Sequence, residues 1–147
     1  MEPADTFCRI ARGEERAYVI YQDEDIMMIL DKAPVSLGHA LVITREHYEG
    51  VQDAPPRLLA KVWVAASAAA TFLRKVREAP GVKVVTNSGS PAGQVVFHFH
   101  VHVIPSWEPG PFRRGVRHDL TEEEAQRAIR LYEGVQDVIR SYLKEVG

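Results

Sequence analysis

Histidine alternates with apolar residues from position 98 to position 103, and no other part of the sequence constrains the fold as strongly. The segment 98–104 reads His-Phe-His-Val-His-Val-Ile. Successive side chains of a β-strand point to opposite faces, so a strand here puts three histidines on one face and apolar residues on the other. We therefore predict a strand over residues 95–104, ended by Pro105.

Three imidazoles on one face of a strand indicate chemistry rather than packing, because burying each ring costs desolvation unless a partner is present. One interpretation is a metal site, since His-x-His pairs bind zinc. However, His98 and His102 have Cα atoms roughly 13 Å apart in a strand, so one ion reaches two rings more easily than three. The other interpretation is phosphorus chemistry, in which a neutral imidazole attacks phosphorus and a protonated neighbour binds the phosphate.

A loop of small residues runs directly into this strand. It reads Asn-Ser-Gly-Ser-Pro-Ala-Gly-Gln over residues 87–94. Glycine lets backbone N–H groups approach an anion closely, which favours the phosphorus chemistry, although a plain turn is the alternative. The loop lacks the Gly-Lys-Ser/Thr end of a P-loop, and the chain has no Rossmann glycine pattern.

The remaining patterns predict an α+β fold with an antiparallel sheet. Pro55 and Pro56 begin a helix of roughly 20 residues with one apolar stripe, which Pro80-Gly81 ends. A capping box at Thr121–Glu124 opens a second helix, whose stripe continues to Tyr142. Strands that are grouped before and after a helix are typical of α+β proteins. The other predicted strands cover residues 17–22, 26–30, 40–44 and 82–86.

Composition narrows the class of protein further. The length of 147 residues predicts one domain over residues 1–147. The 18 basic and 20 acidic residues leave no excess of positive charge for binding a nucleic acid polymer. The longest nearly apolar run, residues 62–73, is too short to span a membrane. The single cysteine, Cys8, and an acidic start without an apolar segment indicate a reducing compartment. We expect a cytoplasmic protein with no membrane partner.

The chain resembles the histidine triad (HIT) family, whose signature is three histidines alternating with apolar residues and followed by one more apolar residue. Residues 98–104 match every position of that signature, and Gly93-Gln94 matches the pair before it. Three upstream segments follow the family pattern in order and spacing: residues 7–14, 31–34 and 38–47. The resemblance covers roughly residues 5–105 and gives least guidance for the C-terminal loop and helix over 106–147.

The resemblance implies a histidine-triad fold, with a five-stranded antiparallel sheet and two main helices. Two subunits would form a homodimer with a continuous ten-stranded sheet, the long helix helping to form the interface. The substrate would be a purine nucleoside phosphate, such as a phosphoramidate or a dinucleoside polyphosphate, cut or transferred at the α-phosphorus without a cofactor. Two alternatives remain: a nucleotide-binding module with little catalysis, and a metal-dependent hydrolase that uses the His-x-His pairs.

Roles for individual residues follow from the same resemblance. His100 would be the nucleophile and form a nucleotidyl-histidine that water resolves. His102 would bind the phosphate, His98 would orient the site, and His39 would complete the cluster. The expected substrate-binding residues are Asp31 for the ribose hydroxyls, Asn87 and Gly93 for the phosphate, and Gln94 beside the leaving group.

The chain departs from the family pattern in two places. Many histidine triad hydrolases carry Ser or Thr after the Gly-Gln pair, where this chain has Val95, so leaving-group departure is in question. Some relatives bind a structural zinc through two cysteines and two histidines. The matching positions here are Asp5, Cys8, His47 and His98. Because aspartate replaces the first cysteine, we assign no metal and name these four as candidates for a weaker zinc site.

Three arginines follow the histidine strand in a loop rich in proline and glycine. Arg113, Arg114 and Arg117 could reach a polyphosphate tail. The alternative is a solvated loop without a role in binding.

Overall fold

The computed structural model of the protein describes residues 5–112 and 117–146. Five antiparallel strands form one sheet in the order β1-β2-β3-β5-β4. The strands are β1 (Val19–Gln22), β2 (Ile26–Leu30), β3 (Ala40–Thr44), β4 (Gly81–Val85) and β5 (His100–Ser106). The α-helices are α1 (Thr6–Ala11), α2 (Pro56–Lys75), α3 (Glu122–Leu131) and α4 (Val135–Val146), and a 3₁₀ turn covers Ser90–Ala92. The predicted α+β class and five-stranded antiparallel sheet are confirmed.

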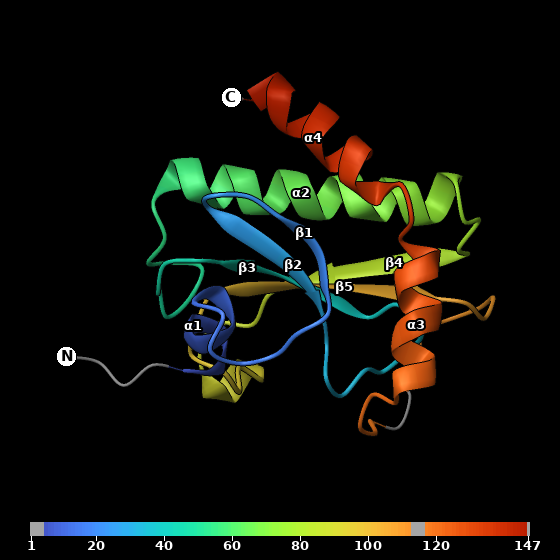
Figure 1. Ribbon diagram of the computed structural model, residues 1–147, viewed down its shortest axis with the longest axis horizontal. Coiled ribbons are helices and arrows are strands. Elements are labelled where there is room, and N and C mark those ends of the chain that lie inside the picture. The colour runs from blue at the N-terminus through green and yellow to red at the C-terminus, as the bar shows by residue number, and fades with distance from the viewer. Residues whose placement is uncertain (1–4, 113–116, 147) are drawn as a thin grey trace.

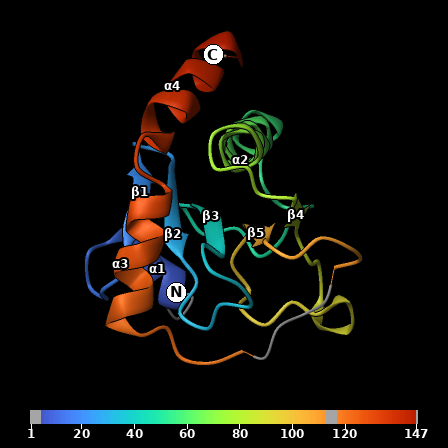
Figure 2. The ribbon, with the colours of Figure 1, turned by 90° about the vertical axis from the view of Figure 1, so that its right-hand side faces the viewer.

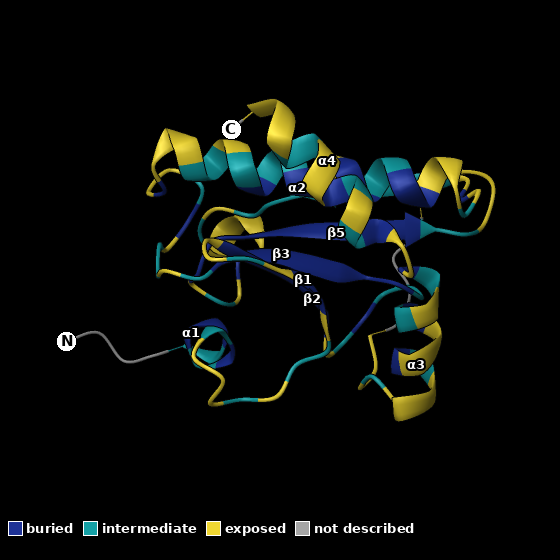
Figure 3. Cartoon of the chain, turned by 45° about the horizontal axis from the view of Figure 1, so that its top comes forward, coloured by how far each residue is buried: buried dark blue, intermediate teal, exposed yellow. Residues whose placement is uncertain are grey.

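Helices cover both faces of the sheet (Figures 1 and 2). The long helix α2 lies across one face, and α4 packs on α2 and β1. The short helix α1 lies on the opposite face, where Phe7 and Ile10 pack on Met27, Leu41 and Ile43. Since β2 and β3 are buried along their whole length, they carry apolar residues at nearly every position (Figure 3).

The register between β3 and β5 decides which way the histidines point. His100 lies opposite Ile43 and His102 opposite Leu41, two residues of the apolar cluster beneath α1. Val101 and Val103 belong to the core under α2. The predicted alternation is therefore confirmed, and it directs the reactive rings to the face that only a short helix covers.

The predicted strand over 95–104 is wrong at both ends. Residues 95–99 are irregular. The Gln94 side-chain amide ties this segment to neighbouring loops: it donates to Glu49 O and Val96 O and accepts from Gly89 N. At the other end β5 continues to Ser106. Proline has no backbone N–H to donate, but β3 pairs with β5 only as far as Val103, so Pro105 leaves no bond to β3 unmade. The Pro105 carbonyl oxygen accepts from Ser36 Oγ at 2.7 Å.

The predicted helix from Pro56 is α2, which ends at Lys75, before Pro80-Gly81, and the helix predicted from the capping box at Thr121 begins there as α3. One C-terminal helix was expected, but the chain forms α3 and α4 with a break at Gly134, whose φ of 96° is in the left-handed region. The capping box at Thr121 and Glu124 is present. Helix α1 was not predicted at all, although Asp5 caps it by accepting from Cys8 N at 2.7 Å. Among the described residues, no helix is both long and apolar enough to cross a membrane.

The C-terminal segment holds the loop between β2 and β3 in place. Leu120 N donates to Lys32 O, Trp107 Nε1 to Leu37 O and the buried Tyr132 hydroxyl to Gly38 O. This loop begins at Asp31 and ends at His39, so three bonds from distant residues fix the position of two predicted site residues.

Candidate active site

A cavity of about 460 Å³ opens on the face of the sheet that carries the histidines. The lining is apolar where α1, β2 and β3 contribute to it, and polar where His100, His102 and residues of the loops contribute. The lining residues are Thr6, Phe7, Ile10, Ala17, Ile29, Leu30, Asp31, Lys32, Leu41, Asn87, Gly93, Val95, Val96, His100, His102 and Arg117. A larger cavity of about 830 Å³ between the ends of α2 and α4 contains none of the predicted site residues.

Backbone hydrogen bonds fix the protonation of His100. Its Nδ1 lies 2.6 Å from the carbonyl oxygen of His98, which can only accept, so the ring proton is on Nδ1. The other nitrogen, Nε2, therefore carries a lone pair. No hydrogen bond in the described residues uses Nε2, and no fully buried side-chain nitrogen or oxygen there lacks a partner. Nε2 must therefore reach the open cavity that His100 lines.

A second chain of hydrogen bonds fixes His39 and His102. Val35 N–H donates to His39 Nδ1 at 3.1 Å, which places the His39 proton on Nε2. His39 Nε2 then donates to His102 Nδ1 at 2.9 Å. The His102 proton consequently lies on Nε2, so the cavity receives a lone pair from His100 and an N–H donor from His102.

Burial keeps these rings neutral at physiological pH. It lowers the pKa of His102 to about 3, and the neighbouring His100 and His39 lower it further. Burial also lowers the pKa of His39 to about 4, against the opposing effect of the Asp31 carboxylate. For His100, burial again depresses the pKa, while its bond to the His98 carbonyl acts in the other direction. The predicted protonated neighbour is therefore replaced by a neutral donor, His102.

The other predicted residues separate into two groups. Asp31, Asn87, Gly93 and Val95 line the cavity, with Val95 exposed over 85% of its surface. Gln94 does not line it, since its buried amide holds the preceding loop together. The apolar wall from α1 was missed by sequence reasoning. Asp5, the N-cap residue of α1, was the sequence signal for this helix and hence for the wall. An N-cap residue is easily overlooked before a helix of only six residues.

The arginine cluster is only partly described. Arg113 and Arg114 lie outside the described residues. Arg117 lines the cavity, donates from Nη1 to Ala33 O at 2.6 Å and lies 3.7 Å from Asp31 Oδ2.

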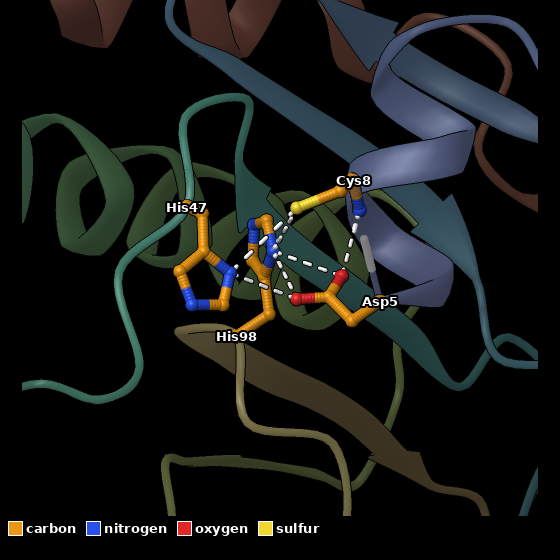
Figure 4. Close-up of side chains that lie close together, drawn as sticks. All are labelled: Asp5, Cys8, His47 and His98. Carbon is orange, nitrogen blue, oxygen red and sulfur yellow. Dashed lines mark hydrogen bonds and ion pairs between the residues drawn. The ribbon is translucent and has the colours of Figure 1, made fainter. Parts of the chain in front are cut away.

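A cluster of metal-binding groups lies behind His98, between α1 and the loop after β3 (Figure 4). Cys8 Sγ is 3.6 Å from His47 Nδ1 and 3.5 Å from His98 Nδ1. The Asp5 carboxylate is 2.9 Å from His47 Nδ1 and 3.1 Å from His98 Nδ1. Ligands of a tetrahedral zinc ion lie about 3.3–3.8 Å apart, which is close to this spacing.

The tautomer of His98 also fits a metal. Its Nε2 lies 2.6 Å from Thr44 O, which can only accept, so Nε2 carries a proton and Nδ1 faces Asp5 and Cys8. Nδ1 can bind the Asp5 carboxylate through a proton, and in neutral His98 it has a lone pair for a zinc ion held with that carboxylate. The four residues therefore fit a zinc ion. Asp31, His39 and His102 also lie within reach of one ion, but there the His39 N–H already occupies the His102 lone pair.

Comparison with known proteins identifies the family. The HIT domain family model matches residues 12–108. A hypothetical histidine triad nucleotide-binding protein of Sulfolobus tokodaii is 34% identical, with a TM-score of 0.77 over 93% of each chain. A zinc-bound histidine triad family protein of Mycobacterium smegmatis is 32% identical, with a TM-score of 0.73 over 96% of each chain. An adenylylsulfatase of Arabidopsis thaliana is 35% identical over 69% of this chain and 52% of its own length.

This chain belongs to the HIT family. The resemblance carried by residues 98–104 is thereby confirmed. The matched region ends at residue 108, so α3, α4 and Arg117 lie beyond it.

We predict that the purified protein contains about one zinc ion per chain and that a chelator lowers its melting temperature. A ligand that binds only the folded state stabilises it, and the stabilisation grows with the logarithm of ligand concentration over Kd. Asp5→Asn is the informative variant, because its side-chain oxygen can still cap α1 at Cys8 N while the anionic ligand is lost. Zinc content and the chelator effect should both fall in this variant. Equal zinc in the two proteins would contradict the assignment of Asp5.

We also predict that the free energy of unfolding falls below pH 6.5 and that His39 contributes to the fall. The folded pKa of His39, about 4, is below its unfolded value near 6.5, so the unfolded chain binds more protons in this range. Asp31, Arg117, His100 and His102 face this ring, and only Asp31 raises its pKa. Between pH 7 and pH 5, wild type should lose about 1–2 kcal/mol more than His39→Gln in urea unfolding. Equal losses would exclude His39 as the source.

Proposed function

We propose that this protein is a nucleotide hydrolase or nucleotidyl transferase that cleaves at the α-phosphorus of a purine nucleoside phosphate, through a covalent nucleotidyl-histidine on His100. The observation that carries the proposal is the pairing of a His100 Nε2 lone pair with a His102 Nε2–H in the lining of one cavity. A nucleophile and a donor to the same phosphate are what phosphoryl transfer through histidine requires.

The proposed reaction has two steps. His100 Nε2 attacks the α-phosphorus, a nitrogen–phosphorus bond forms, and the leaving group departs with the electrons of its bond and takes a proton from water. The nucleotidylated ring is cationic. Its Nδ1–H still donates to the His98 carbonyl oxygen, which lies 2.6 Å from Nδ1 in the free protein. Water then attacks phosphorus, the nitrogen–phosphorus bond breaks, and one proton is released with the nucleotide.

The cavity has suitable surfaces for the rest of a nucleotide. Phe7, Ile10 and Ile29 form an apolar wall for the base. Asp31 has a carboxylate for the ribose hydroxyls. The Asn87 side-chain amide, which has no partner among the described residues, lies beside Gly93 and is available to the phosphate.

The zinc site would serve this reaction indirectly. Asp5, Cys8 and His47 do not line the cavity, so a metal ion there faces away from the substrate. When bound, zinc supplies a cross-link between α1 and His98. This geometry favours the histidine mechanism over a metal-dependent hydrolase.

We predict that His100→Asn reduces turnover of adenosine phosphoramidate and diadenosine tetraphosphate about a thousandfold or more, with chelator present in all assays. The asparagine amide can replace the Nδ1 donor to the His98 carbonyl but has no nucleophilic lone pair. An adenylyl adduct should be found by mass spectrometry after rapid acid-free quenching of wild type, and not of the variant. Unchanged turnover in His100→Asn would overturn the mechanism.

We predict that Val95→Thr raises kcat by about tenfold, because the new hydroxyl can donate to the phosphate or the leaving group. Val95 is 85% exposed, so threonine, which has nearly the same shape, should leave the free energy of unfolding unchanged. Val95→Ala is the control, because it changes the side chain without adding a hydroxyl. If wild type binds AMP without turnover while Val95→Thr is active, the natural role is the binding module. A variant no faster than wild type would show that Val95 does not limit catalysis.

We further propose that two copies form a homodimer through the edge strand β4. β4 is the last strand of the sheet and leaves one row of N–H and C=O groups without a strand partner. Val76 and Phe97 are exposed apolar residues of the chain. Analytical ultracentrifugation at micromolar concentration should give twice the chain mass of 16.5 kDa. A species of 16.5 kDa would refute the dimer.

A further inference from the structure

Arg117 adds a positive charge to the lining of the cavity. In the sequence it lies beyond residues 12–108, which the HIT domain family model matches. Its Nη1 donates to Ala33 O at 2.6 Å and lies 3.7 Å from Asp31 Oδ2. Three residues later, Leu120 N donates to Lys32 O at 2.8 Å. The guanidinium is therefore held against the loop that carries Asp31 before any ligand binds.

The position of Arg117 relative to the histidines is fixed by a short series of contacts. Asp31 Oδ2 lies 3.3 Å from His39 Nε2, and His39 Nε2 lies 2.9 Å from His102 Nδ1. One ligand atom each of Asp31, His39 and His102 lies within 4.8 Å of the other two, so Arg117 approaches a carboxylate that is itself close to the histidines. The contact that positions the guanidinium in the cavity is therefore the one with Asp31, the residue proposed to bind the ribose.

Most of the hydrogen-bonding capacity of this guanidinium is unused. Only Nη1 has a protein partner within residues 5–112 and 117–146, and the side chain is 39% exposed. The remaining N–H groups form the planar fork that binds phosphate oxygens in pairs. Lys32 also lines the cavity, but its ammonium is engaged in an ion pair with Glu15.

We propose that Arg117 determines substrate specificity by binding a phosphate on the 2′- or 3′-hydroxyl of the ribose. This inference rests on the proposed function, in which Asp31 binds the ribose hydroxyls. A carboxylate beside a ribose selects free hydroxyls, while a neighbouring arginine accommodates a phosphate on the same sugar. In this protein the Asp31 carboxylate and the Arg117 guanidinium lie side by side, 3.7 Å apart. The favoured substrates are therefore purine nucleotides with a reactive group at the 5′-phosphate and a second phosphate on the ribose.

The alternative is that Arg117 only positions Asp31 and the 31–39 loop. In that case its loss weakens the binding of every nucleotide by a similar factor. A phosphate-binding role instead changes the ratio of affinities between nucleotides with and without the second phosphate, and this ratio distinguishes the two roles.

The test is calorimetry of AMP, adenosine 2′,5′-bisphosphate and adenosine 3′,5′-bisphosphate, which lack a leaving group and are not turned over. Wild type should bind one bisphosphate at least tenfold more tightly than AMP, and the isomer preferred identifies the hydroxyl. Arg117→Gln should lose this preference, and Arg117→Lys should retain part of it. Lys32→Gln removes one positive charge from the same cavity and should keep the preference. Melting temperatures confirm that each variant is folded.

Two results would overturn the role of Arg117 while leaving the proposed function intact. One is AMP binding by wild type without a bisphosphate preference. The other is an equal loss of affinity for all three ligands in Arg117→Gln. Absence of AMP binding by wild type would instead contradict the proposed function.

Discussion

The hydrogen bond between His100 Nδ1 and the His98 carbonyl is the interaction on which the proposed chemistry depends. It joins residues two apart, so the local backbone is sufficient to form it. The same principle applies twice more, since Thr44 O fixes the His98 proton and Val35 N–H fixes that of His39. Backbone groups cannot change their donor or acceptor character. The fold itself therefore assigns the histidine protons, and no carboxylate is needed to orient His100.

Helix α1 connects this arrangement with the rest of the site. Six residues cannot form a stable helix alone, so tertiary contacts must hold it. Asp5 caps the helix and also faces His47 and His98, while Phe7 lies edge-on to the rings of His98 and His100 at 5.7 and 5.1 Å. A metal ion at this cluster would thus fix the wall of the base pocket and the back of the histidine strand together.

Sequence reasoning succeeded where one periodic pattern dominates and failed where several weak effects compete. The alternation at 98–103 gave the face of each histidine, and the stripe of α2 gave a helix that matches Pro56–Lys75. Gln94 could not be interpreted from its neighbours, because its partners include Glu49, 45 residues away. The break at Gly134 was hidden because the apolar stripe continues from α3 into α4. Arg117 was named without a location, since the bond that places it ends on Ala33, distant in sequence.

His102 and Arg117, two lining residues of the cavity, can hold anions in different ways. His102 has a pKa of about 3, so it donates a hydrogen bond without carrying charge at neutral pH. A neutral donor binds phosphate weakly in the ground state, which leaves product free to depart and lets the interaction strengthen as charge develops. Arg117 is charged at every physiological pH and lies beside Asp31, where the ribose is proposed to bind. A permanent charge can select a substrate there without slowing the chemistry, because its contact is unchanged between the bound substrate and the transition state.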